Sequence, residues 1–279
     1  MPDKINLNRF SQNVKYRVEK KKFRVYLFTF CLTVEDGVKI SIVTIVWNNV
    51  SQIGETMDSV LNQDYPELEY IVIDGASTDG TVEEIEKRRG GLAVFVSEPD
   101  RGIYDAMNKG IARATGDVIG LINSGDRYLP GALKLVAESF AGRDLGNSIF
   151  WGDVIYEKKG RVRGFRPENR YRGAFAPHPS MFVPRRVYER IGAYDTSFRL
   201  LGDYDFMYRA VNHCGVDVIY VPEPVAFYRE GGFSDRNIAA CLRDELHVKL
   251  RYGQPRWKAE TEYFLKLIKN LPRIMLAKC

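Results

Sequence analysis

The feature that most constrains the fold of this sequence is a regular alternation of apolar, β-branched runs with amphipathic segments in its first half. The first run, Lys39–Trp47 (KISIVTIVW), has the composition of a strand buried on both faces. Similar runs follow at Tyr70–Ile73, Leu92–Val96 and Asp117–Ile122. The intervening helices are expected at Ser51–Asn62, Thr81–Arg89 and Ile103–Ala114. This alternation predicts a parallel sheet with right-handed crossover connections.

The rhythm changes after Ser148, where shorter strands and longer loops replace the regular alternation. The strands expected there are Ser148–Tyr156, Arg161–Phe165, Ser180–Val183, Val216–Val221 and Ala226–Tyr228, and the helices are Pro184–Ile191 and Asp203–Cys214. The predicted fold class is therefore α/β, with a mostly parallel central sheet flanked by helices and a smaller second subregion. An apolar content of 45% and a charged content of 28% are typical of a globular protein and argue against a disordered chain or a membrane bundle.

Charge is distributed unevenly along the chain. Residues 1–39 hold nine basic and four acidic side chains, residues 249–279 hold eight basic and two acidic ones, and the body between them is acidic. This pattern fits an anionic membrane surface better than a nucleic acid. Residues 1–38 are expected to be a basic, poorly ordered extension, with an interfacial anchor or an upstream start codon as the alternatives. The four cysteines lack metal-binding spacing and indicate a reducing, cytoplasmic compartment.

The C-terminal tail, residues 251–279, is predicted to contain a basic amphipathic helix. The apolar positions on one side of it are Tyr263, Phe264, Leu267, Ile268 and Leu271, and the basic positions elsewhere are Lys266, Lys269 and Arg273. Such a helix can lie in a membrane interface. The alternative is a helix that packs on the domain and leaves its basic face in solvent.

Acidic residues follow several of the predicted strands. Asp74, Asp100 and Asp126 come after consecutive strands of the parallel sheet, so we expect them to converge at one edge, where α/β proteins bind ligands. A single acid at a strand end is usually only a turn or cap residue. Thr81 and Glu84 have the spacing of a capping box, which predicts the start of a helix just after the first of these acids.

Two common nucleotide-binding signatures are absent from the sequence. No G-x-G-x-x-G follows the first strand and no G-x-x-x-x-G-K-[ST] occurs, which argues against a dinucleotide oxidoreductase and a P-loop enzyme. Carboxylates beside a phosphate require a bridging cation, because two anions repel each other. Oxygen ligands favour Mg²⁺ or Mn²⁺.

Six motifs in a fixed order resemble a known family. They are the strand Lys39–Asn49, VIDGASTDGT, SEPDRGIYDAMNKG, LINSGD, HPSMFV and GDYDF. The sequence is similar to the inverting family 2 glycosyltransferases of GT-A fold, in the branch of bacterial exopolysaccharide and O-antigen biosynthesis. The resemblance extends over Lys39–Ser234, and the SEPD-x-GIYDAMNKG stretch is its most specific part. It implies a Rossmann-like catalytic domain at 39–250, with a nucleotide-sugar half at 39–126 and an acceptor half at 127–250.

The resemblance implies a nucleotide-diphosphate sugar donor, with UDP as the expected nucleotide. Thr44 and Asn48 match positions that line the nucleoside pocket of the family. Asp74 matches the acid that hydrogen-bonds the base, and Asp100 and Asn108 match positions near the ribose and the sugar.

The remaining implied roles concern the chemistry. Asp126 matches the last acid of the D-x-D-type motif that holds Mg²⁺ or Mn²⁺ on the diphosphate. Asp203 matches the general base, although it could instead cap a helix, and Asp205 is a nearby rival for the same role. His178 and Asp205 are candidates for the acceptor or diphosphate site, with the pinning of a loop as the alternative for His178.

Five positions depart from the pattern of the family. Gly75, Asn123, Gly125 and Gly202 stand where acids are common, and Met107 replaces a basic residue. Asp126 is then expected to be the sole carboxylate ligand of the metal.

The predicted function is transfer of a sugar, with inversion, to a lipid-linked or oligosaccharide acceptor during cell-surface polysaccharide assembly. The expected location is the cytoplasm, in peripheral contact with the inner face of the plasma membrane. No nucleic-acid partner is expected, and the sequence does not predict an oligomeric state. The alternative function is that of a non-catalytic sugar-nucleotide binder or scaffold of the same fold.

Overall fold

The computed structural model describes residues 37–166, 176–232 and 236–276. The predicted basic extension, residues 1–38, lies almost entirely outside the described residues.

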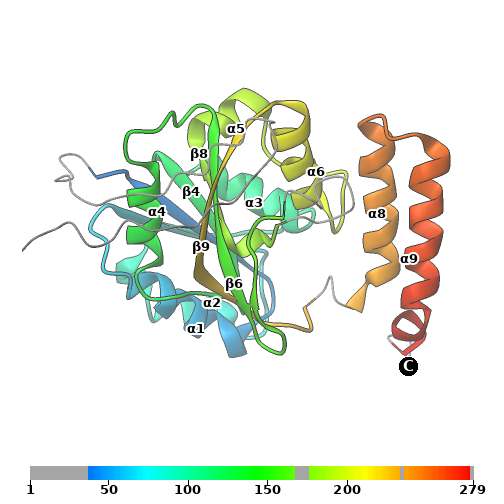
Figure 1. Ribbon diagram of the computed structural model, residues 1–279. Helices are drawn as coiled ribbons and strands as arrows, with labels where there is room; N and C mark the ends of the chain where they lie inside the picture. The colour runs from blue at the N-terminus through cyan, green and yellow to red at the C-terminus, as the bar shows by residue number, and fades with distance from the viewer. Residues whose placement is uncertain (1–36, 167–175, 233–235, 277–279) are drawn as a thin grey trace, which may run out of the picture. The chain divides into compact units, whose positions relative to one another are not determined.

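Four parallel strands form the first half of the sheet, in the order β3-β2-β1-β4 (Figure 1). They are β1 (Ile40–Val46), β2 (Leu68–Asp74), β3 (Val94–Ser97) and β4 (Val118–Asn123). The helices that connect them are α1 (Val50–Leu61), α2 (Thr81–Glu86) and α3 (Ile103–Ile111), and a short 3₁₀ turn, η1 (Arg89–Gly91), follows α2. The predicted alternation of strands and helices is confirmed.

Both faces of this sheet are covered, because each strand sends alternate side chains to opposite sides. Val43 and Ile45 of β1 belong to a core cluster that includes α3 residues, whereas Ile40 and Ile42 belong to a second cluster that includes α1 residues. The runs of β-branched residues are therefore explained by burial on both faces, as is usual for a parallel sheet.

The second half of the sheet is mixed, with the order β4-β8-β6-β9-β5 and β7 paired to β6. Among the strand pairs of this half that the structure describes, β6 with β9 is the only parallel one. The strands are β5 (Arg127–Tyr128), β6 (Ser148–Tyr156), β7 (Gly160–Val162), β8 (Met181–Pro184) and β9 (Asp217–Tyr228). The remaining elements of this half are α4 (Ala132–Phe140), η3 (His178–Ser180), α5 (Arg185–Ile191), α6 (Gly202–Tyr208) and the π-helical turn η4 (Arg209–His213).

One strand replaces two that were predicted separately. Strand β9 runs without interruption through Pro222 and Pro224, where the sequence suggests a break. Its register against β6 is irregular between Trp151 and Val154. An irregular register of this kind leaves backbone groups out of the hydrogen-bond ladder, which is how a strand accommodates proline.

Two long helices end the described chain, α8 (Ile238–Arg251) and α9 (Arg256–Leu276). They pack against each other as a hairpin (Figure 1). Helix α9 confirms the predicted tail helix and continues through Pro272, whereas α8 was not predicted from its sequence. Among the described residues, no helix has the length and apolar character needed to cross a membrane.

Candidate active site

The carboxyl ends of the four parallel strands meet at one edge of the sheet. Val46 at the end of β1 pairs with Asp74 at the end of β2, and Asp74 pairs with Ser97 at the end of β3. On the other side, Ile45 pairs with Asn123 at the end of β4. The loops that follow these strands therefore converge, as predicted.

Asp74 lies at this edge with no solvent exposure, and its own loop already engages it. Its carboxylate accepts hydrogen bonds from the Ser77 amide at 3.0 Å and the Ser77 hydroxyl at 2.5 Å. The Ser97 hydroxyl donates a third at 2.6 Å. A carboxylate has about four acceptor positions, so roughly one is left for a further donor. Contact with a nucleotide base stays a prediction for this residue.

The two other residues predicted near the nucleoside differ in placement. Asn48 lies in the exposed loop after β1, where its side-chain oxygen accepts from the Thr78 amide at 2.8 Å and orders the neighbouring loop. Thr44, in contrast, is completely buried, and its hydroxyl lies 2.9 Å from the Tyr70 hydroxyl. Thr44 therefore has no surface for direct contact with a ligand in this conformation.

The surroundings of Gly75 explain why no acid stands at this position, where the family commonly has one. A Cβ atom at Gly75 would lie 2.5 Å from Oδ2 of Asp100 and 3.3 Å from the Trp47 ring. The carboxylate of Asp100 thus occupies the space that a side chain at position 75 would need. Its other oxygen accepts from the Gly102 amide at 2.8 Å. The second acid at this strand end comes from the next loop instead of from position 75.

Asn108, on α3, holds the backbone of Tyr194 through both ends of its side chain. Its amide nitrogen donates to the Tyr194 carbonyl at 2.8 Å, and its amide oxygen accepts from the Tyr194 backbone N–H at 3.0 Å. Both ends of the side chain are therefore committed to backbone. The position near the ribose and sugar, predicted from the family resemblance, stays a prediction.

Asp126 ends the loop after β4 and is 5% exposed. Its Oδ1 accepts from the backbone N–H of Arg229 at 3.0 Å. Thr56 on α1 fixes the same loop, because its hydroxyl donates to the Asp126 carbonyl at 2.8 Å and accepts from the Gly125 amide at 2.9 Å. The loop is thereby held between α1 and the residue that follows β9.

The donor atoms of this loop suit a hard cation bound with its substrate. Oδ1 of Asn123 is buried and has no hydrogen-bond partner among the described residues. Within those residues, no three His, Cys, Asp or Glu side chains gather as a metal-binding group. Mg²⁺ typically uses one or two carboxylates together with substrate phosphates and water. Asp126 and Asn123 fit that minimal protein share of the coordination.

Asp203 lies in the first turn of α6, half-buried, and contacts Tyr104 of α3. The Tyr104 hydroxyl is 3.1 Å from Oδ1 of Asp203 and 2.6 Å from the Leu200 carbonyl, so its one proton can serve either acceptor. A Cβ at Gly202 would lie 2.9 Å from the Tyr104 ring. The missing acid at position 202 is thus explained by the aromatic ring that occupies its space.

Burial keeps two neighbouring side chains, Tyr104 and His178, in their neutral forms. Burial raises the pKa of Tyr104 well above its usual range, and the charge of Asp203 adds to this, so the phenol stays a donor at neutral pH. Burial lowers the pKa of His178, although Asp203 acts in the opposite direction. His178 is therefore neutral at pH 7, and its Nε2 lies 3.3 Å from the Tyr194 hydroxyl.

Asp205 does not join this group. Two residues along a helix correspond to a rotation of about 200°, so Asp203 and Asp205 point to opposite sides of α6. Asp205 is 1% exposed and contacts Arg251 Nη1 at 3.1 Å and the Tyr252 hydroxyl at 3.2 Å, at the end of α8. Burial raises its pKa despite the nearby guanidinium of Arg251. Its predicted place in an acceptor or diphosphate site does not agree with this position.

The sequence prediction did not identify several residues that build the site. Tyr104 lies within the specific GIYDAMNKG motif, which could have drawn attention to it. Tyr194 and Arg229 carry no local signal, because they reach the site only through tertiary contacts. The sequence places Trp47 only at the end of the first strand, but its side chain is 68% exposed beside Gly75. A cleft of about 450 Å³ lies between the start of α3 and residues 196–199, with Tyr104 in its lining.

Comparison with protein families and curated proteins gives consistent matches. The model for "Glycosyl transferase family 2" matches residues 41–201. An uncharacterised glycosyltransferase of Mycobacterium tuberculosis H37Rv is 34% identical over 237 residues, which cover 78% of this chain and 87% of the relative. A PGL/p-HBAD biosynthesis glycosyltransferase of Mycobacterium bovis BCG is 28% identical over 228 residues, covering 76% and 86% of the two chains.

Solved structures share the fold. The mannosyltransferase PcManGT of Pyrobaculum calidifontis, in complex with GDP-Man and Mn²⁺, aligns with a TM-score of 0.64 at 22% identity, over 87% of this chain and 74% of that one. Residues 1–349 of S. aureus TarS, in complex with UDP, align with a TM-score of 0.59 at 18% identity, over 84% and 72%. The α/β fold described above is therefore the GT-A-like fold expected from the sequence.

Proposed function

The chain belongs to glycosyltransferase family 2, and on this basis we propose that it transfers a sugar from a nucleotide-diphosphate donor with inversion at the anomeric carbon. The acceptor in this proposal is a lipid-linked or oligosaccharide hydroxyl. The observation that carries the proposal is the position of Asp203, half-buried at the start of α6 and hydrogen-bonded by Tyr104, in a chain whose strand-end acids gather at one edge of the sheet.

The donor would lie along this edge. Trp47 offers an exposed aromatic face beside Asp100, to which a planar base can stack. Asp74 has capacity for one more hydrogen bond, but it is fully buried, so contact with the base would require its loop to open. Asp126 and Asn123 would hold Mg²⁺ or Mn²⁺ against the diphosphate. When bound, the metal would neutralise the charge that develops on the leaving group. The complexes of the two solved structures, TarS with UDP and PcManGT with GDP-Man and Mn²⁺, support a donor of this class.

Asp203 would act as the general base. As the acceptor oxygen attacks the anomeric carbon, the bond from that carbon to the diphosphate breaks, and the hydroxyl proton passes to Asp203. A single displacement of this kind inverts the anomeric centre. Within the described residues, the Tyr104 hydroxyl and the Tyr204 amide both contact Oδ1 of the Asp203 carboxylate. Oδ2 would then be the atom that takes the proton.

We place this reaction in the assembly of exopolysaccharide or O-antigen, in the cytoplasm at the inner face of the plasma membrane. The support for this branch is the resemblance of the SEPDRGIYDAMNKG motif. The cleft between the start of α3 and residues 196–199 is the proposed approach for the acceptor, because Tyr104 connects it to Asp203.

A thermal-shift screen of UDP- and GDP-sugars, with and without Mn²⁺, tests donor binding, because a ligand of the native state raises the melting temperature. We expect a metal-dependent shift that Asp126→Asn removes and that Asp203→Asn retains. A donor-hydrolysis and transfer assay then tests catalysis. Binding without turnover across donors and acceptors would instead support the scaffold alternative.

A further inference from the structure

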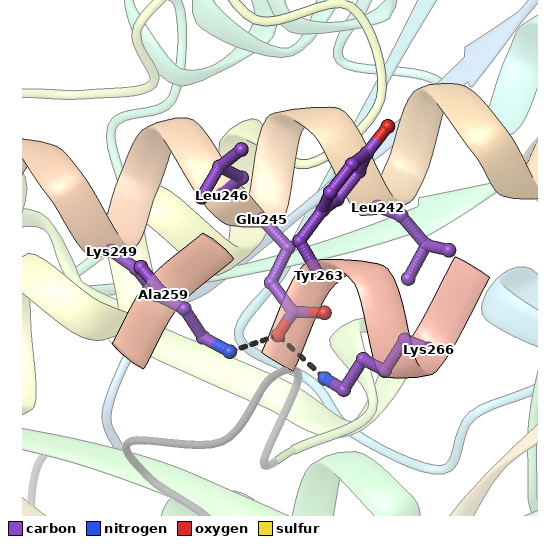
Figure 2. A pocket seen from close by; sticks show the side chains of 7 residues that line it. All are labelled: Leu242, Glu245, Leu246, Lys249, Ala259, Tyr263 and Lys266. Atoms are coloured by element: carbon purple, nitrogen blue, oxygen red, sulfur yellow. Dashed lines mark hydrogen bonds and ion pairs between the residues drawn. The ribbon is translucent and has the colours of Figure 1, made fainter. Parts of the chain in front are cut away.

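Helices α8 and α9 contact each other through charged side chains. The Lys249 ammonium, on a residue that is 2% exposed, lies 2.5 Å from Glu245 and 2.7 Å from Glu262. Lys266 approaches the same Glu245 oxygen at 2.5 Å. Figure 2 shows the Glu245 carboxylate between the two ammonium groups, with Ala259 beside them. Helix α9 therefore turns a polar side toward α8.

The opposite side of α9 is apolar and exposed. We call it the outer stripe: Trp257 (72% exposed), Phe264 (57%), Leu265 (63%), Ile268 (68%), Leu271 (48%) and Met275 (65%). At 100° per residue these positions fall on one side of the helix, away from Ala259, Glu262 and Lys266. Six of the nine large hydrophobic residues exposed on the described surface lie here. These side chains are exposed, so the alternative of a helix that packs its apolar face against the domain does not describe the structure.

Positive charge borders the outer stripe. Lys258 and Lys269 are exposed on one flank of it. The two acids of α9 are already paired, Glu260 with Arg256 and Glu262 with Lys249. The helix thus presents an apolar surface with a basic margin.

We propose that the outer stripe docks on the surface of an anionic phospholipid bilayer, with α9 lying in the interface. The stripe runs about 27 Å from Trp257 to Met275 at 1.5 Å per residue, long enough to lie along a membrane. A bilayer with anionic lipids complements both its apolar centre and its basic margin. A second copy of the same face would bring like charges together, which disfavours self-association.

This docking would position the proposed active site, and in that respect it rests on the proposed function. Arg251 and Tyr252, at the end of α8, contact Asp205 at 3.1 and 3.2 Å. Asp244 of α8 accepts hydrogen bonds from the backbone N–H groups of Leu200 and Leu201 at 3.1 and 3.3 Å. The segment that carries Asp203 is therefore tied to the docking hairpin, which would hold it near a lipid-linked acceptor.

Cosedimentation of the full chain with vesicles tests the proposal. We expect binding to vesicles that contain phosphatidylglycerol, little binding to phosphatidylcholine alone, and a loss of binding at high salt. The pair Phe264→Asp and Ile268→Asp should reduce vesicle affinity more than tenfold. Lys258→Gln with Lys269→Gln should reduce it by about thirtyfold, since each of the two cations near the surface contributes about 1 kcal/mol. Val50→Asp, which changes an exposed hydrophobic residue on α1, is the matched control.

Two outcomes would overturn the proposal. One is equal vesicle binding by the native chain and the Phe264→Asp, Ile268→Asp pair, provided that both have the same melting temperature. The other is a concentration-dependent dimer that this pair dissociates, without binding of the native chain to vesicles. Donor hydrolysis without vesicles separates the two proposals, because we expect the same rate in the native chain and the docking variants. If the native chain itself showed no donor hydrolysis, this result would contradict the proposed function and not the docking.

Discussion

The two ends of the parallel strands both carry buried or half-buried acids, but they are built differently. At the amino end, Glu69 of β2 accepts hydrogen bonds from the Ser41 hydroxyl at 2.5 Å, the Thr115 amide at 2.7 Å and the Thr115 hydroxyl at 2.5 Å. Lys39 adds an ion pair at 3.4 Å. Glu69 is 9% exposed, and its carboxylate is surrounded by donors that the protein itself supplies.

At the carboxyl end, Asp74 is likewise buried and accepts three hydrogen bonds, but two other acids there have fewer donors and lie beside exposed surface. Asp100 is half-exposed next to Trp47, and Asp203 is half-buried with two contacts that share one oxygen. Burial alone would raise the pKa of Glu69, but Ser41, Thr115 and Lys39 together hold it at about 2. The comparison teaches that an acid at a strand end marks a site only where the protein leaves part of its hydrogen-bonding capacity unused.

The largest effect is expected from Asp203→Asn. This change removes the proposed base with little change of shape, so kcat for transfer should fall by about a hundred- to ten-thousand-fold. Steady-state transfer rates, with melting temperature as a check of folding, provide the measurement. Asp205→Asn is the matched control, two residues away on the other side of α6, and should retain turnover. Full activity in Asp203→Asn would exclude this residue as the base.

A substitution at the amino end of the strands should change the stability of the protein and not its activity. Glu69→Gln should lower the free energy of unfolding at pH 7 by about 3 kcal/mol, because a pKa shift of one unit corresponds to about 1.4 kcal/mol. A carboxyl group with a lowered pKa stabilises the fold above its usual pKa near 4.5 and loses that effect as the pH falls toward 2. Denaturant titrations across this range should show the native chain and the variant converging in acid. A constant difference at all pH values would contradict the assignment.

Gly75→Ala tests the close approach at the carboxyl end. The new methyl group would lie 2.5 Å from the Asp100 carboxylate and displace it, so we expect about a tenfold rise in the KM of the donor, or about 1.4 kcal/mol. Gly90→Ala is a clean control, because nothing lies within 4 Å of the added atom there. If Gly75→Ala and Gly90→Ala had similar donor KM values, Asp100 would have no part in donor binding.

The smallest effect is expected from Thr44→Val, at a residue that the resemblance places in the nucleoside pocket. Because its buried hydroxyl bonds to Tyr70, the free energy of unfolding should fall by about 1 kcal/mol while the KM of the donor is unchanged. Donor titrations at matched folded concentration provide the test. A raised donor KM in Thr44→Val would indicate that Thr44 does contribute to the nucleoside pocket.

The sequence predicts the first half of the fold well, because local signals and global packing agree there. Strand and helix alternation places Asp74, Asp100 and Asp126 at the correct edge. The same period of two could have predicted that Thr44 points inward with Ile40 and Ile42. The orientation of a side chain on a buried strand is therefore more predictable than the sequence interpretation allowed.

Other features depend on contacts between distant parts of the chain. The predicted capping box at Thr81 does not form, because its hydroxyl donates to Asp79 at 2.5 Å and accepts from the Asn49 amide at 2.9 Å. That interaction ties α2 to the loop after β1. The contact of Tyr104 with Asp203 joins residues that are 99 positions apart. No local pattern encodes either arrangement.

The hydrogen bond from the Arg229 amide to Asp126 has a consequence for the order in which the protein matures. Its partners are 103 residues apart, and β9, which ends just before Arg229, inserts between β6 and β5. During synthesis the parallel strands emerge long before this residue does. Contacts of such sequence separation form late, because the intervening chain must first be ordered. Most of the sheet is therefore synthesised before the loop that carries Asp126 can acquire this contact, so the final geometry of that loop depends on the late insertion of β9.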